Sequence, residues 1–311
     1  MATAPHPVPL PIDGERERAE RHCHPSPSPR TRGEGRGERL SPAITLAEGA
    51  TEILATAGPA GKVALSRALA ARWRDGDMAV GRSTPPARPA RPSRPVLLPP
   101  RDMPKRRNFG STAGRVALLH ALAHIEFNAI DLAWDLVVRF SDCGLPRAFY
   151  ADWLGVAAEE AEHFALLSGR LAALGADYGA LPAHDGLWQA AAATAHDLVA
   201  RLAVVPLVLE ARGLDVTPEM IRRLERAGDD ESAAILTRVY RDEIGHVAVG
   251  VRWFEHLCHE RGLDPQTAFH DRVRRHFSGA LKPPFNRAAR DQAGFPATYY
   301  EKLECGAFGP L

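Results

Sequence analysis

The sequence predicts an all-α protein built around an antiparallel four-helix bundle with one long crossover. Between residues 109 and 263, apolar residues recur at alternating steps of three and four, the period of one helix face. The long segments with this pattern span about 25 to 30 residues, a length typical of bundle helices. No segment alternates in the manner of a β-strand. An extended proline-rich N-terminal arm should precede the bundle, and a short C-terminal helical extension should follow it.

The composition sets limits on the class of protein. The 311 residues are 45% hydrophobic and 25% charged, which is enough apolar material for a packed core. No uninterrupted apolar run approaches the roughly 18 to 20 residues of a membrane helix, and Pro206 breaks the longest one. The four cysteines show no CxxC spacing, and the N-terminus lacks an apolar signal core. We therefore expect a cytoplasmic protein with reduced thiols and no membrane partner.

The chain divides into segments by composition. Low-complexity sequence fills residues 1–40, which are either disordered or translated from upstream of a mis-called start. The eight prolines between residues 85 and 104 exclude a regular helix there. The expected segments are the low-complexity stretch 1–40, a small helical segment 41–82, the arm 83–108, the bundle 109–263 and the extension 264–311.

Capping and breaking residues predict where the bundle helices begin and end. Thr217-Pro218 has the sequence of a helix start, and Gly228-Asp229-Asp230 should separate two helices. Pro206 should bend the helix that contains it. The expected helices are Thr112–Ser141, Pro146–Gly175, Asp185–Gly213, a short one after Pro218, and a long one from Asp230 to Gly262.

Four glutamates interrupt the apolar faces of these helices, at Glu126, Glu160, Glu210 and Glu243. Burying an unpaired carboxylate costs several kcal/mol, so four of them need a compensating positive charge. One alternative source is a set of arginines on the same helices, namely Arg201, Arg212, Arg241 and Arg252. These arginines mostly fall off the apolar faces, which favours metal ions instead.

Two Glu-x-x-His motifs support a metal site. Residues three apart on a helix lie on nearly the same face, so Glu160 with His163, and Glu243 with His246, can each bind one ion. A lone glutamate precedes each motif at a nearly equal distance, because Glu126 comes 34 residues before Glu160 and Glu210 comes 33 residues before Glu243. The predicted ligands are Glu126, Glu160, His163, Glu210, Glu243 and His246, with Glu160 and Glu243 bridging two ions. Carboxylate and imidazole donors suit two iron ions, or manganese, or a mixed pair, although zinc is not excluded by affinity.

Other polar residues near the motifs have weaker assignments. Asp131 and Asp242 are candidates to orient the ligand imidazoles, as metal-bound histidine usually requires. Tyr240 is a candidate hydrogen-bond donor or site of one-electron oxidation, and a packed core tyrosine is the simpler interpretation. Glu159 and Glu162 point to other helix faces and are expected to be solvated.

The ligand pattern resembles that of the ferritin-like di-iron carboxylate proteins. Several stretches closely resemble the bacterial ferritin-like family catalogued as domain of unknown function 455, over roughly residues 85–303. They are HALAHIEFNAIDLAWD (120–135), EEAEHF (159–164), PAHDGLW (182–188), LEARGLD (209–215), DEIGHVAVGVRWF (242–254) and LKPPFNRAAR (281–290). The resemblance implies a ferritin-like bundle, in a superfamily that includes ferroxidases, iron stores, a tRNA-modifying hydroxylase and other oxygenases.

Three functions are compatible with these observations. The first is a di-iron oxidoreductase that uses dioxygen to hydroxylate or oxidise an organic substrate, such as a small metabolite or a modified tRNA nucleoside. The second is a ferroxidase or iron-handling protein. The third is a metal-stabilised protein without catalysis, with weak support for nucleic-acid binding from the clusters 105–107 and 272–275. The arm and extension favour a monomer or dimer over a many-subunit storage shell.

Overall fold

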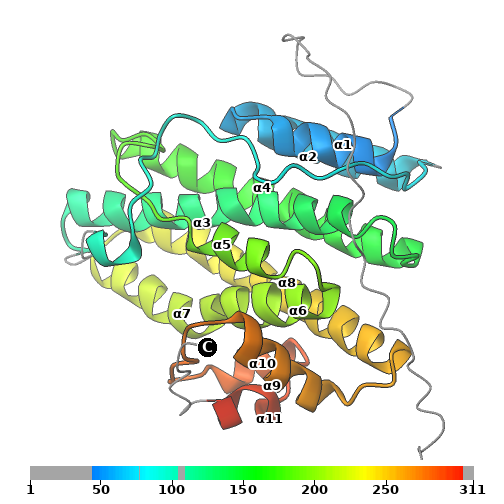
Figure 1. Ribbon diagram of the computed structural model, residues 1–311. Helices are drawn as coiled ribbons and strands as arrows, with labels where there is room; N and C mark the ends of the chain where they lie inside the picture. The colour runs from blue at the N-terminus through cyan, green and yellow to red at the C-terminus, as the bar shows by residue number, and fades with distance from the viewer. Residues whose placement is uncertain (1–43, 77, 104–108, 304–311) are drawn as a thin grey trace, which may run out of the picture.

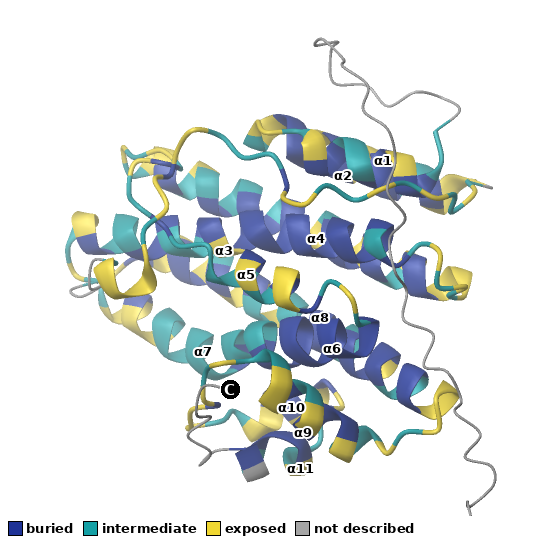
Figure 2. Cartoon of the chain, in the orientation of Figure 1, coloured by how far each residue is buried: buried dark blue, intermediate teal, exposed yellow. Residues whose placement is uncertain are grey.

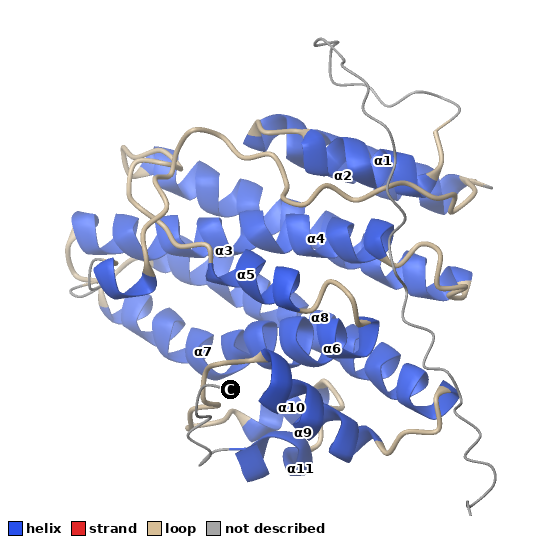
Figure 3. Cartoon of the chain, in the orientation of Figure 1, coloured by secondary structure: helices blue, strands red, loops and turns tan. Residues whose placement is uncertain are grey.

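The computed structural model describes residues 44–76, 78–103 and 109–303, and all regular elements in these ranges are helices (Figure 3). The predicted all-α class is therefore confirmed. Within the described ranges the strand-like pairing is limited to one isolated bridge, between Leu97 and Ala183. The low-complexity stretch 1–40 lies outside the described residues.

The helices α3 (Thr112–Arg139) and α4 (Arg147–Ala173) are packed side by side along most of their length (Figure 1). Ser111 begins α3 by accepting a hydrogen bond from the backbone N–H of Gly114, which satisfies one of the free donors of the first turn. A short turn joins the two helices, so they run in opposite directions. Their bounds lie within two residues of those expected from the sequence.

The segment after α4 is divided differently from the expectation. In place of one helix from Asp185 to Gly213, the chain forms α5 and then α6, with the Asp197 side chain capping the start of α6. The helix beyond Glu210 also continues through Gly213 and Pro218, so the start predicted at Pro218 is wrong. The observed elements are α5 (Gly186–Ala193), α6 (Leu198–Val204), the π-helix η2 (Val205–Glu210), α7 (Ala211–Arg226) and α8 (Asp230–Glu260).

Pro218 is tolerated inside α7 because the backbone group that it leaves without a partner is satisfied from elsewhere. A proline at this position cannot donate to the carbonyl of Leu214, four residues earlier. The side-chain amide of Asn286 donates to that carbonyl instead, at 3.1 Å. A contact from a distant part of the chain therefore allows α7 to continue through Pro218, although the local sequence predicts a helix start there.

Pro206 lies in the π-helix η2, whose turn holds one residue more than an α-helical turn. The α8 helix comes close to this turn at Gly250. A Cβ atom built on Gly250 would lie 2.6 Å from the Cβ of Pro206. Glycine is needed here because any larger residue would push α8 away from η2.

Two further groups of helices cover this core, one at each side in Figure 1. The helices α1 (Leu46–Ala55) and α2 (Pro59–Asp75), in blue, pack on α3 and α4. The orange-to-red group packs on α6, α7 and α8, and it comprises α9 (Pro265–His276), α10 (Arg287–Gln292), α11 (Ala297–Tyr300) and the 3-10 helix η3 (Glu301–Leu303).

The proline-rich segment between α2 and α3 runs without an α-helix over its described residues, apart from the 3-10 turn η1 (Pro100–Asp102). This segment contacts α1 and the loop before α5. The N–H of Ala90 donates to the carbonyl of Leu54, and the N–H of Leu98 donates to the carbonyl of Ala183. The arm also contacts α3, because Arg91 donates to the side chain of Asn128 and Arg139 donates to the carbonyl of Pro86.

Figure 2 shows that buried residues follow the inner faces of the long helices. By length and composition, α3 could cross a membrane. However, 72% of its most apolar 18-residue stretch is buried inside the protein, so length and composition are weak evidence for a membrane span. Among the cysteines, Cys258 is a buried free thiol, whereas Cys143 is disulfide-bonded. The expectation of reduced thiols throughout is therefore wrong at Cys143.

Candidate metal centre

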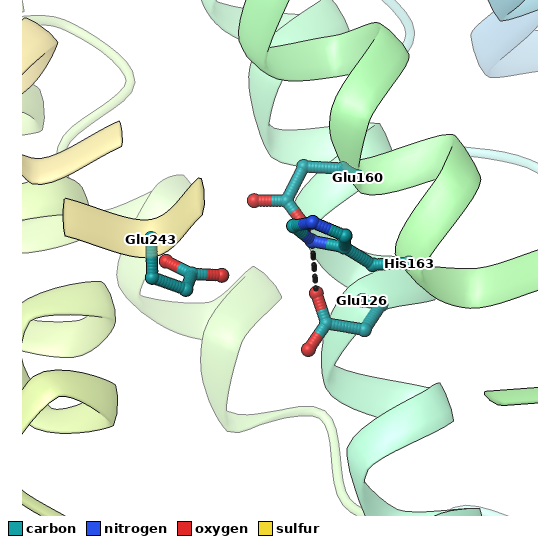
Figure 4. A group of neighbouring side chains, drawn as sticks. All are labelled: Glu126, Glu160, His163 and Glu243. Carbon is teal, nitrogen blue, oxygen red and sulfur yellow. Dashed lines mark ion pairs between the residues drawn. The ribbon is translucent and has the colours of Figure 1, made fainter. Parts of the chain in front are cut away.

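The six residues predicted as metal ligands converge in the interior from four elements. Glu126 lies in the middle of α3, and Glu160 and His163 lie one turn apart on α4. Opposite them, Glu243 and His246 lie one turn apart on α8, and Glu210 is the last residue of η2. Figure 4 shows four of these side chains, with Glu243 directed towards Glu126, Glu160 and His163.

The distances between the donor atoms are short. Oxygen or nitrogen atoms of Glu126, Glu160, His163 and Glu243 all lie within 4.8 Å of one another. His163 Nδ1 is 3.6 Å from an oxygen of Glu126 and 3.6 Å from an oxygen of Glu160. His246 Nδ1 is 3.0 Å from Glu160 Oε1 and 3.7 Å from Glu243 Oε2. Glu160 therefore contacts both imidazoles.

Most of these donor atoms are buried and lack a hydrogen-bond partner. Such atoms cost free energy unless a further group occupies the space between them, about 1–3 kcal/mol each and more for charged groups. The atoms without a partner in the centre are Glu126 Oε2, both oxygens of Glu160, His163 Nδ1, Glu210 Oε2, Glu243 Oε2 and His246 Nδ1. A pair of cations at this position would satisfy all of them, so the residues present fit a metal centre.

The two imidazoles are held by carboxylates from the opposite helix. His163 on α4 has its Nε2 3.1 Å from Asp242 on α8. His246 on α8 has its Nε2 2.8 Å from Glu159 on α4. An Nε2–H that donates to a carboxylate leaves Nδ1 with its lone pair, and Nδ1 is the atom that faces the centre in both rings. Nδ1 is thus the atom that each histidine could offer to a metal.

These contacts correct two assignments made from the sequence. Glu159 is 55% exposed as expected, but its carboxylate orients His246 and is therefore more than a solvated charge. Asp131 does not orient an imidazole, because it forms buried ion pairs with Lys62 and Arg91. Asp242 has the role predicted for it as the partner of an imidazole. A signal for Glu159 was present, since both acids directly precede the glutamate of a Glu-x-x-His motif.

The remaining assigned residues are occupied elsewhere. The Tyr240 hydroxyl accepts a hydrogen bond from Asn286 at 2.9 Å. Glu162 pairs with Arg238, whose guanidinium is also 3.8 Å from Asp242. The arginines considered as alternative counter-charges pair with other acids: Arg201 with Asp135, Arg212 with Asp215 and Arg252 with Asp152, whereas Arg241 is exposed. Among the described residues, these arginines do not neutralise the four glutamates.

The electrostatics of the cluster indicate a shortage of positive charge. Burial, together with the neighbouring Glu160 carboxylate, raises the pKa of Glu126 well above its usual range. Burial and the Glu243 carboxylate do the same for the pKa of Glu210, and burial and Glu160 raise the pKa of Glu243. Burial would also raise the pKa of Glu160, but the adjacent His246 and His163 hold it below its ordinary value.

The pKa values of the two imidazoles are raised as well, because neighbouring carboxylates outweigh the effect of burial. Burial lowers the pKa of His163, but the Glu126 and Glu160 carboxylates outweigh burial and raise the pKa to about 11. Burial likewise opposes a positive charge on His246, yet Glu160 and Glu159 raise its pKa well above the usual value. Without a metal, the cluster therefore retains protons on both imidazoles and on several carboxyl groups. Metal ions would compete with those protons for the same donor atoms.

This chain is therefore an all-helical protein with a buried cluster of glutamates and histidines that could hold a metal. The family described as protein of unknown function (DUF455) matches residues 55–301, and the chain belongs to this family. The chain is also 46% identical over 211 residues to a protein of Haemophilus influenzae described as uncharacterized, a match that covers 66% of this chain and 73% of that protein. No solved structure matches the chain.

Proposed function

We propose that the protein is a dinuclear iron carboxylate protein that uses dioxygen to hydroxylate or oxidise an organic substrate. In this proposal α3, α4, the η2–α7 segment with α6, and α8 form a ferritin-like four-helix bundle. The six ligands are Glu126, Glu160, His163, Glu210, Glu243 and His246. Manganese, or a mixed manganese and iron pair, is the alternative metal content.

The observation that carries the proposal is the set of buried donor atoms without partners, contributed by all six of these residues. Unpaired carboxylates are costly in a purely structural core, where apolar residues of the same size would be more stable. Four glutamates and two neutral histidines carry a charge of −4, which two divalent cations would balance. Carboxylate oxygens and imidazole nitrogens together are donors suited to iron and manganese.

The protein's own groups would fix the geometry of such a centre. Glu160 contacts both imidazoles, and Glu243 lies across from it, which supports the proposal that these two carboxylates would bridge two ions. Asp242 and Glu159 keep the Nε2 protons of His163 and His246 and so direct each Nδ1 inward. Two redox-active ions bound there would supply the electrons for the reduction of dioxygen.

The elements around the bundle favour a discrete enzyme over an iron store. The arm contacts α3 through Arg91 and the carbonyl of Pro86, and the C-terminal helices pack on α6, α7 and α8. Surfaces covered in this way are not free for subunit contacts within a storage shell. The organic substrate in this proposal is a small metabolite or a modified tRNA nucleoside.

Metal analysis tests the proposal directly. Protein purified without chelator should contain close to two equivalents of iron or manganese, and the ferrous protein should consume dioxygen. Glu160→Ala should abolish binding of both ions, since a bridging ligand serves each of them. Glu260→Ala, at the exposed end of α8, is the matched control and should retain them.

The outcomes separate the alternatives. Equal metal content in the wild type and in both variants would rule out the glutamates as ligands, and with them the proposed enzyme. Oxidation of many ferrous ions per chain would instead indicate iron handling. Tight metal binding without any consumption of dioxygen would indicate a metal-stabilised protein.

A further inference from the structure

The C-terminal extension is hydrogen-bonded to the start of α7, directly after Glu210. Arg290 on α10 donates from Nε and Nη2 to the two oxygens of Asp215, at 2.9 and 2.8 Å. The same Nη2 donates to the carbonyl of Ala211 at 3.2 Å. Ala211 is the residue next to Glu210, so these bonds hold the backbone from which the Glu210 side chain projects.

Arg290 is itself held rigidly. Only 3% of the residue is exposed, and its guanidinium lies 4.9, 5.3 and 4.3 Å from the ring centres of Phe285, Phe295 and Tyr300. A planar guanidinium that is enclosed by aromatic rings and bonded to both oxygens of a carboxylate has one orientation available. The contact with α7 is therefore a fixed one and does not resemble a mobile surface ion pair.

Asn286 adds a second connection, and this one spans two helices. Its side-chain amide nitrogen donates to the carbonyl of Leu214 on α7 at 3.1 Å and to the hydroxyl of Tyr240 on α8 at 2.9 Å. Tyr240 lies one turn before Glu243. The amide group therefore uses both of its hydrogens to fix the spacing between the helices that carry Glu210 and Glu243.

We infer that Asn286 and Arg290 are positioning residues that set the relative placement of Glu210 and Glu243. They act through Ala211, Leu214 and Tyr240, and they do not touch the centre themselves. The inference rests on the proposed function, because it concerns the ion that Glu210, Glu243 and His246 would share. It explains why a peripheral extension contributes a buried arginine to this part of α7.

Cobalt titration of the metal-free protein provides the test, with the visible absorption of bound Co²⁺ as the readout. The wild type should bind two equivalents of Co²⁺. Arg290→Lys keeps the charge but loses the two-point contact with Asp215. It should weaken one of the two equivalents about tenfold or more, the usual effect of losing a group that supports a ligand. The other equivalent should keep its wild-type affinity.

Arg272→Lys is the matched control within the same extension. Arg272 also pairs with an aspartate, Asp197 at 3.0 Å, but that contact lies at the start of α6, away from Glu210. This variant should bind both equivalents of Co²⁺ as the wild type does. Asn286→Ala serves as a second test should Arg290→Lys fail to fold, as judged by circular dichroism, and it too should weaken one equivalent.

Two results would overturn the inference. One is an Arg290→Lys protein with wild-type Co²⁺ affinities and spectrum but a lower melting temperature, which would make the arginine a stabilising residue only. The other is an equal loss of affinity in Arg272→Lys, which would show a general effect of the extension. If the wild type binds no Co²⁺ at all, it is the proposed metal centre that fails, and this result is distinct from the other two.

Discussion

The Glu159 carboxylate on α4 lies 2.8 Å from Nε2 of His246 on α8, and the reverse pairing joins Asp242 on α8 to His163 on α4. In each case the acid directly precedes the glutamate of its own Glu-x-x-His motif. The two motifs therefore orient each other's imidazoles across the interface between the helices. A change in either acid should disturb the imidazole on the opposite helix, and with it the proposed metal site.

The first prediction concerns Glu159. Glu159→Ala should weaken metal binding about tenfold, because His246 loses the group that fixes its ring. Glu159→Gln keeps an oxygen that can accept from Nε2 and should restore most of the affinity. Calorimetric titration of the metal-free proteins measures this, with Glu260→Ala as the control. Wild-type affinity in Glu159→Ala would show that the exposed carboxylate has no such role.

The second prediction is the pH dependence of the metal-free protein. Glu126, Glu210, Glu243, His163 and His246 all have raised pKa values, so the folded state binds more protons than the unfolded state. Their contribution to stability is complete below the unfolded pKa values and is lost as the pH rises through the folded ones. For His163 that window runs from 6.5 to about 11.

Chelator-treated protein should therefore melt at progressively lower temperature as the pH is raised above about 6.5, measured by differential scanning calorimetry. Below this pH the lowered pKa of His124 acts in the opposite direction, and at strongly alkaline pH the lowered pKa of Lys62 does so too, so the comparison is best made between neutral and mildly alkaline pH. Glu126→Gln should reduce the slope, because it removes one of the carboxyl groups that titrates. A melting temperature that rises with pH in this range would contradict the arrangement of charges.

The third prediction concerns Asp131, which belongs to a separate ion-pair cluster. Its partners Lys62 and Arg91 come from α2 and the arm, and neither Lys62 nor Asp131 has an exposed side chain. Asp131→Ala would leave a buried lysine without its partner, so the free energy of unfolding in urea should fall by about 3–5 kcal/mol. Metal content per folded chain should stay unchanged. Loss of one equivalent of metal would instead restore the assignment of Asp131 to the centre.

The fourth prediction uses two glycines in helices. Gly250→Ala would place a Cβ 2.6 Å from the Cβ of Pro206, and a proline ring cannot move aside as a flexible side chain can. We expect a loss of about 1–3 kcal/mol in the free energy of unfolding. Gly169→Ala on α4 meets open space and should stabilise the protein by about 1 kcal/mol. Similar effects from the two substitutions would show that α8 does not approach η2 closely.

Periodicity and spacing were sufficient to predict the helices α3, α4 and α8 and the convergence of the six residues proposed as ligands. Local patterns were sufficient because each of these helices buries one long apolar face. The course of α7 was not predictable, because Pro218 has the local sequence of a helix start. Only Asn286, 68 positions further along the chain, removes the cost of a proline inside the helix.

The roles of Glu159 and Asp131 were missed for a similar reason. The position of Glu159 on its helix lies away from the apolar face, and its carboxylate is exposed. It nevertheless contacts His246 on the neighbouring helix α8. Asp131 lies on α3 between two cationic groups, one of them in the arm, and neither can be assigned to it before the fold is known. Pairings between elements depend on tertiary packing, which a single sequence does not encode in its local pattern.

The π turn at Val205–Glu210 holds one residue more than an α-helical turn would need to join α6 to α7. Elsewhere in these helices, removal of one residue would rotate everything that follows by about 100° and turn buried faces outward. The π turn already contains one extra residue. If that residue were deleted, the turn would become α-helical, and α6 and α7 would keep their present registers. The segment that ends at Glu210 is thus a place where the length of the protein can change while its helices stay packed, and the shape of the space beside Glu210 would change with it.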